Sequence, residues 1–181
     1  MSEFLLKENR DKLQRMSNMI RYNNEVHIHD ENVAEHSFYV AVYAMELCDV
    51  LHIKPELRNL IVEKALIHDI HEIELSDIPH NVKKASKDLE DYCMAFEDKF
   101  NRRYFKNLIE SIDDCKLCTY VDAIVELADV LSVKQYAQQE VMFGNVKKFS
   151  PILENSNYRI DKLIEVISRY TIHWSDIKFL I

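Results

Sequence analysis

The scarcity of glycine and proline constrains the fold of this chain more than any other feature of its sequence. Only one glycine and three prolines occur among 181 residues. The tight turns of β-hairpins depend on such residues, above all on glycine, which adopts positive φ without strain. The sequence therefore disfavours β-hairpins and predicts an all-α protein.

Length and composition indicate a single domain that covers residues 1–181. A chain of this size can bury a substantial core. Its residues are 48% hydrophobic and 30% charged, which is typical of a globular protein in water. We therefore expect one compact helical bundle.

Helical spacing of apolar residues predicts a series of helices joined by short connectors. They cover residues 5–20, 33–51, 56–72, 85–113, 117–140 and 157–170. Asn32 and Glu35 form the capping-box pattern at the start of the second helix. That helix is apolar nearly all round, so we expect it to be central. Non-helical turns are expected before Pro79 and around Gly144 and Pro151.

The C-terminal segment 172–181 is rich in apolar residues. A free terminus is normally polar and mobile. This one is therefore expected to dock, either on the core of its own chain or on a neighbouring chain.

Charge and composition exclude several classes of protein. The formal net charge of -8 argues against a nucleic-acid-binding surface, which needs clusters of basic residues. No apolar run approaches the roughly 18 residues that a membrane span needs, and the N-terminus lacks a signal-peptide pattern. We therefore expect a cytoplasmic protein without a membrane partner. Its cysteines are expected to be reduced thiols; they are Cys48, Cys93, Cys115 and Cys118.

The segment Ala65–Glu72 contains a cluster of ionisable residues of the types that bind metal ions. His68 and Asp69 lie side by side at the end of an apolar run, and Glu72 follows one helical turn after His68 if the segment stays helical. Burying these groups costs on the order of several kcal/mol unless a partner compensates. A divalent metal compensates an imidazole and a carboxylate together, but it needs further ligands from the rest of the chain.

Two other ionisable side chains are expected to point inward from core helices. His36 projects from the apolar face of helix 33–51, and Asp129 projects from the apolar face of helix 117–140. With His68 and Asp69 they form a set of two imidazoles and two carboxylates, which suits Mn, Fe, Co, Ni or Zn better than Mg or Ca. Another interpretation stays open for each: His36 could be a hydrogen-bonded core histidine, and Asp129 could pair with an arginine.

These motifs resemble the H…HD…D signature of HD-domain phosphohydrolases, and more narrowly the bacterial 5'-deoxynucleotidase branch. The matching segments are Arg21, Asn32–Ser37, His68–Asp69 with Glu72, Asp77 with Pro79, Val82–Lys83, and Asp129. The resemblance implies a compact helical domain that binds one divalent metal. It also implies hydrolysis of nucleoside 5'-monophosphates to nucleoside and phosphate, and assembly as a homo-oligomer.

The resemblance implies that His36, His68, Asp69 and Asp129 are the metal ligands, because they match the ligand positions of the family's motif. Arg21 would hold the phosphate, since its planar guanidinium presents a fork of donors to phosphate oxygens. The alternative interpretation of Arg21 is a solvated cation at a helix end.

The resemblance gives further roles to residues beyond the ligand set. Glu72 and Asp77 would serve acid–base and sugar-positioning roles, and the sequence leaves open which of them is the acid. Tyr22 stands where the family usually has tryptophan, so selectivity for sugar and base is open. Lys83 is a further cation near the substrate. Alternatively, Glu72 is a surface carboxylate and Asp77 is a turn residue.

Three functions are compatible with these residues. The first is a metal-dependent 5'-nucleotidase acting on deoxynucleoside monophosphates. The second is a triphosphohydrolase of the same fold, which would need Lys83 or Lys84 to turn inward, because a triphosphate carries about two more negative charges. The third is a non-catalytic nucleotide-binding module, which is disfavoured because every metal and acid–base position is filled.

Overall fold

The computed structural model describes residues 12–181, apart from the side chains of His80 and Asn81, and this part of the chain is helical. Its only β-type pairing is an isolated antiparallel bridge between Ile20 and Asn32. The prediction of an all-α protein is therefore confirmed. Within residues 12–181, no helix is long and apolar enough to cross a membrane. The four cysteines are free, as expected.

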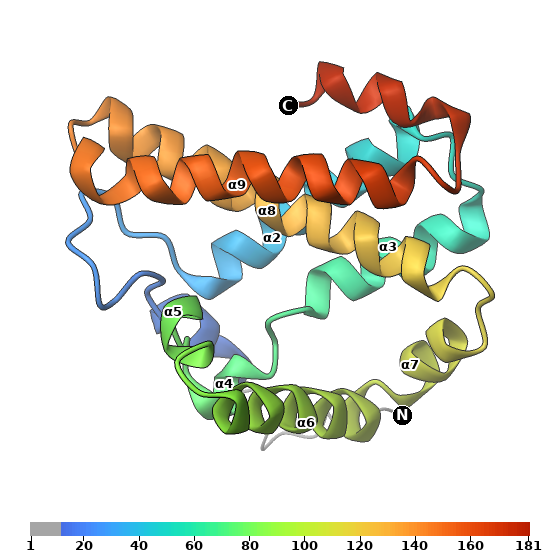
Figure 1. Ribbon diagram of the computed structural model, residues 1–181. Coiled ribbons are helices and arrows are strands. Elements are labelled where there is room, and N and C mark those ends of the chain that lie inside the picture. Colours follow the sequence, from blue (N-terminus) through green and yellow to red (C-terminus); the bar gives the residue numbers. More distant parts are fainter. Residues whose placement is uncertain (1–11) are drawn as a thin grey trace.

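The helical elements follow one another with short connections, apart from the longer loop of residues 19–32 between η2 and α2 (Figure 1). In chain order they are η2 (Gln14–Asn18), α2 (Val33–Val50), α3 (Pro55–Ile67), α4 (Glu72–Leu75), α5 (His80–Lys83), α6 (Lys87–Tyr104), α7 (Lys106–Asp113), α8 (Cys118–Met142), α9 (Val146–Ile167) and η3 (Ile172–Phe179).

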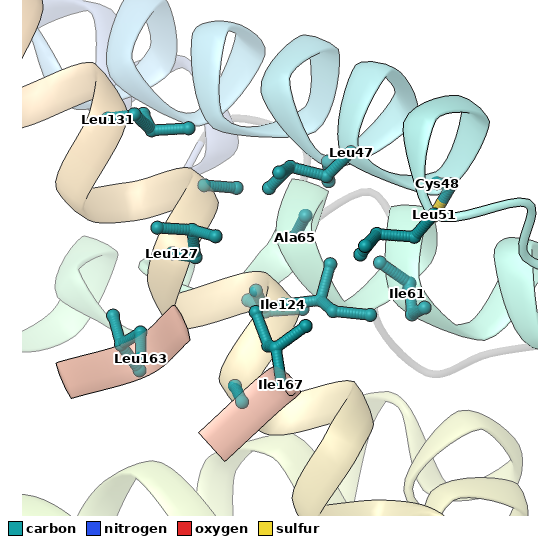
Figure 2. Packing of buried hydrophobic residues seen from close by; sticks show 14 of the residues in the cluster. Leu47, Cys48, Leu51, Ile61, Ala65, Ile124, Leu127, Leu131, Leu163 and Ile167 are labelled. Atoms are coloured by element: carbon teal, nitrogen blue, oxygen red, sulfur yellow. The ribbon is translucent and has the colours of Figure 1, made fainter. Parts of the chain in front are cut away.

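Helix α8 is the centre of the bundle. It packs along α9 and also against α2 and α3, while α6 runs along the side of the molecule away from α9 (Figure 1). The main core lies between α2, α3, α8 and α9, and Figure 2 shows how their aliphatic side chains meet. Its labelled members are Leu47, Cys48, Leu51, Ile61, Ala65, Ile124, Leu127, Leu131, Leu163 and Ile167. Burying each large aliphatic side chain contributes about 1.5–3 kcal/mol, so this core holds the site-bearing helices in place.

Helix α2 begins as predicted but is less buried than predicted. The side chain of Asn32 accepts a hydrogen bond from the backbone of Glu35, whose own side chain accepts one from the backbone of Asn32. On the outer face, however, Phe38, Val42 and Met45 are exposed. Among residues 12–181, other elements pack against one face of α2 and leave the opposite face open, because the packing partners that decide burial come from distant parts of the chain.

The prediction of one helix over residues 56–72 is wrong at its C-terminal end. Helix α3 stops at Ile67, and turns follow up to residue 71. There the backbone hydrogen bonds tighten to the i→i−3 type, as in those from Ile70 to Ile67 (3.0 Å) and from Glu72 to Asp69 (3.0 Å). His68 and Glu72 therefore do not share the face of a regular helix.

Three other predicted boundaries also shift. Residues 5–11 of the first helix lie outside the described residues, and the remainder ends in η2 at Asn18. The segment 85–113 divides into α6 and α7 at Phe105. The last helix begins at Val146 instead of residue 157, so Pro151 lies inside α9. An interior proline costs about 3 kcal/mol, and the packing of α9 on α8, with Phe149 fully buried, offsets that cost.

The C-terminal segment docks on its own chain. Helix η3 packs against α2, and Ile177 is fully buried in the main core. Ile172 and Phe179 remain exposed on the outer side. Docking on the chain's own core was one of the two expected outcomes.

Candidate metal centre and active site

Four predicted ionisable groups converge from three parts of the fold. His36 comes from α2, His68 and Asp69 from the turn after α3, and Asp129 from α8. His36 Nε2 lies 3.3 Å from His68 Nε2, 3.7 Å from Asp69 Oδ2 and 3.2 Å from Asp129 Oδ1. His68 Nε2 lies 3.1 Å from Asp69 Oδ2. The break after Ile67 turns His68 and Asp69 toward α2 and α8.

The spacing of these atoms fits a shared metal ion. Ligands at about 2.1 Å from one ion lie about 3.0–3.5 Å from each other. His36, His68 and Asp69 form a group in which the ligand atoms all lie within 4.8 Å of one another. Asp129 joins the group through its contact with His36.

Hydrogen bonds orient both imidazoles. His68 Nδ1 lies 2.8 Å from the carbonyl oxygen of Ala65, which only accepts, so Nδ1 carries the proton. In the neutral ring this leaves the lone pair of Nε2 facing the centre. His36 Nδ1 lies 3.0 Å from the hydroxyl of Ser132, which likewise leaves Nε2 toward the other ligands. Such outer contacts are typical of metal-binding histidines.

The electrostatics of the group also suit a cation. Burial, aided by the charge of Arg21, lowers the pKa of His36 to about 4, so this ring is neutral at neutral pH. Burial alone would lower the pKa of His68, but the Asp69 carboxylate raises it to about 9. The pKa of Asp69 is well below its usual range, because the contact with His68 outweighs the effect of burial. A buried cluster that retains a negative carboxylate in this way can hold a divalent ion.

Arg21 is held beside this centre by a residue that the sequence reasoning missed. Its Nη1 atom donates to Glu31 Oε2 at 2.6 Å, and both side chains are largely buried. The backbone N–H of Arg21 also donates to the carbonyl oxygen of Glu31 (2.9 Å). Arg21 is therefore not a solvated helix-end cation. The only signal for Glu31 was its place in a polar loop.

Glu72 is buried close to the metal ligands. Burial, together with the charges of Asp69 and Asp77, raises its pKa to about 9. Lys83 Nζ lies 3.6 Å from Glu72 Oε1. The interpretation of Glu72 as a surface carboxylate is therefore wrong. In the absence of a bound cation, its carboxyl group holds a proton at neutral pH.

Asp77 and Tyr22 form a neighbouring part of the site. Burial raises the pKa of Asp77, and a hydrogen bond from the backbone of Tyr22 partly opposes that shift. Tyr22 has a positive φ of 57°. Its ring stacks on Tyr136 with centroids 5.0 Å apart and meets Phe149 edge-on. These contacts fix the aromatic ring as a wall of the site.

A cavity of about 470 Å³ joins these side chains, a volume within the range of small-molecule sites. It is lined by Arg21, Tyr22, Asn24, Glu25, Asp69, Glu72, Asp77, Ile78, Pro79, Lys83, Asp129, Val133, Pro151, Ile152, Asn155, Ser156 and Arg159. The structure thus gathers the predicted substrate and acid–base residues round one cavity. His36 and His68 are not among its lining residues and lie behind Asp69 and Asp129.

The sequence did not predict that α9 lines one side of the cavity. Pro151, Asn155 and Arg159 line the cavity, although residues 151–156 were expected to lie in a loop. No local pattern marks Arg159 as a site residue. Ser132 was also missed; it follows Asp129 by one helical turn, but its partner His36 lies 96 residues away in the sequence.

Comparison with solved structures shows the class of this fold. An HD-domain phosphohydrolase from Listeria innocua aligns with a TM-score of 0.72 at 20% identity, over 94% of this chain and 84% of that chain. The cyanophage S-2L HD phosphohydrolase DatZ, solved with dA and one catalytic Zn²⁺ ion, aligns with a TM-score of 0.67 at 13% identity, over 94% and 92%. A protein of Pyrococcus horikoshii aligns with a TM-score of 0.68 at 22% identity, over 96% and 94%.

The fold is therefore that of the HD-domain phosphohydrolases, and it brings His36, His68 and Asp69 into a group that could hold a metal ion. More specifically, the chain belongs to the YfbR-like 5'-deoxynucleotidase family, whose sequence pattern matches residues 10–172. No curated protein matches the chain at a significant level. The resemblance seen in the sequence is confirmed.

Proposed function

We propose that this protein hydrolyses (deoxy)nucleoside 5'-monophosphates to nucleoside and phosphate. One observation carries the proposal: the buried guanidinium of Arg21 lines the same cavity as Asp69 and Asp129, two of the four converging ligand residues. In the reaction, water adds to phosphorus, the bond between phosphorus and the 5' oxygen breaks, and that oxygen takes up a proton. The family match supports the same substrate class.

The metal ligands in this proposal are His36, His68, Asp69 and Asp129. They would hold one divalent transition metal, which is Co, Mn, Zn, Fe or Ni, because two nitrogen and two oxygen ligands disfavour hard cations. The bound ion would supply Lewis acidity at the phosphoryl group and lower the pKa of water at this position.

The remaining groups bind the substrate and move protons. Arg21, immobilised by Glu31, donates to phosphate oxygens, and Lys83 adds positive charge on the side of Glu72. Glu72 is the proposed proton donor to the leaving 5' oxygen, because it lines the cavity and its burial favours the protonated carboxyl group. Asp77, hydrogen-bonded to the backbone of Tyr22, is placed to orient water or a sugar hydroxyl.

The second candidate is hydrolysis of a deoxynucleoside triphosphate to tripolyphosphate. The position of Lys83 favours it, since this cation lines the cavity instead of pointing into solvent. Lys84 is not placed to bind a triphosphate, because its side chain is more than half exposed and its Nζ atom lies 3.7 Å from Glu90 Oε1. We rank the monophosphate first because the family match favours it.

Product analysis separates the two candidates. The protein is incubated with dAMP or dATP at equal concentration in cobalt or manganese buffer, with Glu72→Gln as the inactive control. We expect rapid release of orthophosphate from dAMP. Tripolyphosphate from dATP, with dAMP untouched, would overturn the proposal in favour of the second candidate. Binding of both nucleotides without any product would favour a non-catalytic module.

A further inference from the structure

Arg159 reaches the metal side of the cavity from α9. Its Nη2 atom lies 3.8 Å from Asp129 Oδ2 and 3.3 Å from Glu126 Oε1. Both carboxylates belong to α8, but they differ in setting: Asp129 lies in the metal group, whereas Glu126 is exposed to solvent. The other oxygen of Asp129, Oδ1, faces His36. A phosphoryl group held at the metal ligands would therefore lie within reach of Arg159.

Arg159 makes longer and more exposed ion-pair contacts than Arg21 does, so more of its N–H donors can bind a ligand. Arg21 makes a 2.6 Å contact with the buried Glu31, which neutralises most of its charge. The contacts of Arg159 are longer, and one of them is to a carboxylate that water screens. A guanidinium carries five N–H donors, so Arg159 retains donors for a ligand in the cavity that it lines.

Charge balance at the site calls for such a cation. The carboxylates of Asp69 and Asp129 neutralise a bound divalent ion, so the metal centre carries no net charge that would attract the substrate. The ion pair of Arg21 and Glu31 is neutral as well. A phosphate monoester brings about two negative charges at neutral pH. Lys83 and Arg159 are the cavity-lining cations that lack a buried, tightly bonded counter-ion among the described residues. Together they supply two positive charges against the two negative charges of the monoester; the carboxyl group of Asp77, which also lines the cavity, adds a negative charge where it is ionised.

We propose that Arg159 is a second phosphate-binding residue, and that Glu126 restrains it in the absence of substrate. The inference rests on the proposed function and deepens it, because a clamp from Arg21 on one loop and Arg159 on α9 selects a phosphoryl group between them. An alternative role as a tie between α8 and α9 is weak, since the contact with the exposed Glu126 contributes only about 0–1 kcal/mol and the contact with Asp129 Oδ2 is 3.8 Å long.

The test measures binding of orthophosphate and of deoxyadenosine to the metal-loaded protein by calorimetry, which needs no turnover. The variants are Arg159→Ala, Arg159→Lys and Glu126→Gln. The matched control is Lys162→Ala, which removes a solvent-exposed cation from the next turn of α9. Metal content is determined for each variant.

For Arg159→Ala we expect orthophosphate binding to weaken about 10–100-fold, as for the loss of a charge-assisted hydrogen bond, with deoxyadenosine binding and metal content unchanged. Arg159→Lys should recover part of the loss. Glu126→Gln should tighten orthophosphate binding by releasing Arg159, and Lys162→Ala should change nothing.

Three results would overturn the inference. The first is unchanged orthophosphate binding in Arg159→Ala. The second is weaker binding in Glu126→Gln. The third is loss of metal from Arg159→Ala, which would make Arg159 a residue that orients Asp129. Failure of the proposed function would look different: the wild-type protein would release no phosphate from dAMP, whatever the orthophosphate affinities.

Discussion

Removing the carboxylate of Glu140 should destabilise the protein and loosen its substrate site. Glu140 is fully buried near the end of α8. It accepts hydrogen bonds from the backbone N–H groups of Ile28 (2.9 Å) and His29 (2.7 Å), and from Asn145 Nδ2 (2.8 Å). It thereby ties the loop before α2 to the connection between α8 and α9. That loop includes Glu31, the partner of Arg21.

The expected magnitude follows from these donors. Hydrogen bonds to a charged group contribute about 1.5–3 kcal/mol each, so three donors contribute at most about 4.5–9 kcal/mol. The loop carries exposed side chains such as Ile28, so water can reach part of the backbone after a substitution. We therefore expect Glu140→Gln, which keeps one acceptor, to lower the free energy of unfolding by about 2–3 kcal/mol.

The effect has a defined dependence on pH. Burial alone would raise the pKa of Glu140, but its hydrogen bonds from Asn145, His29 and Ile28 hold the pKa below the ordinary value of 4.5. A group whose pKa is lowered by folding stabilises the protein fully above its ordinary pKa, and this contribution is lost as the pH falls through the folded-state value. The difference between wild type and Glu140→Gln should therefore be constant above about pH 5.5 and shrink below pH 4.5.

Thermal denaturation of the metal-loaded proteins checks this prediction. For a chain of this length, a loss of 2–3 kcal/mol lowers Tm by roughly 4–12 °C. The control is Glu165→Gln, which removes an exposed carboxylate paired with Lys162 and should change stability by less than about 0.5 kcal/mol. In the same samples, KM for the nucleotide should rise in Glu140→Gln. Equal Tm values for Glu140→Gln and wild type at neutral pH would refute the reasoning.

Further predictions concern the proposed ligands, the proton donor, the phosphate contact and assembly. Asp129→Ala should lose both metal and activity and unfold at a lower temperature; full metal occupancy by elemental analysis would remove Asp129 from the ligand set. Glu72→Ala should keep metal and nucleotide binding while kcat falls about 10²–10⁴-fold, and an unchanged kcat would rule out its acid role. Arg21→Ala should raise KM and lower kcat together, because its donors serve both the bound substrate and the transition state; steady-state kinetics with both values unchanged would exclude the phosphate role. Sedimentation should show a homo-oligomer at micromolar concentration, consistent with the exposed apolar residues Phe38 and Met45 on α2, and a monomer would contradict this.

The residue types of the proposed site were readable from the sequence because the signals are local. The adjacent His68 and Asp69 at the end of an apolar run, and the apolar helix faces that carry His36 and Asp129, are visible in the sequence pattern, whereas their assignment as metal ligands came from the resemblance to HD-domain phosphohydrolases. The capping box at Asn32 is likewise a pattern within four neighbouring positions. Such features predict the all-α class and the class of ligand without knowledge of any long-range contact.

The partners of these residues could not be read in the same way. Glu31 holds Arg21, Ser132 orients His36 across 96 residues of sequence, and Arg159 approaches Asp129 from another helix. Long-range pairs of this kind depend on how the helices cross, and the periodicity within each helix carries no information about that crossing.

Sequence alone therefore determined the helical class, the start of α2 and the ionisable residue types of the proposed metal group, since each can be read from composition or from the pattern of a single segment. Tertiary structure decided that α3 ends at Ile67 and that α9 continues through Pro151. The first change lets His68 and Asp69 face α2 and α8, and the second brings Asn155 and Arg159 to the cavity. At Pro151 packing between distant segments offsets the local preference of the backbone, because an interior proline costs about 3 kcal/mol and burying a large side chain such as Phe149 contributes about 1.5–3 kcal/mol.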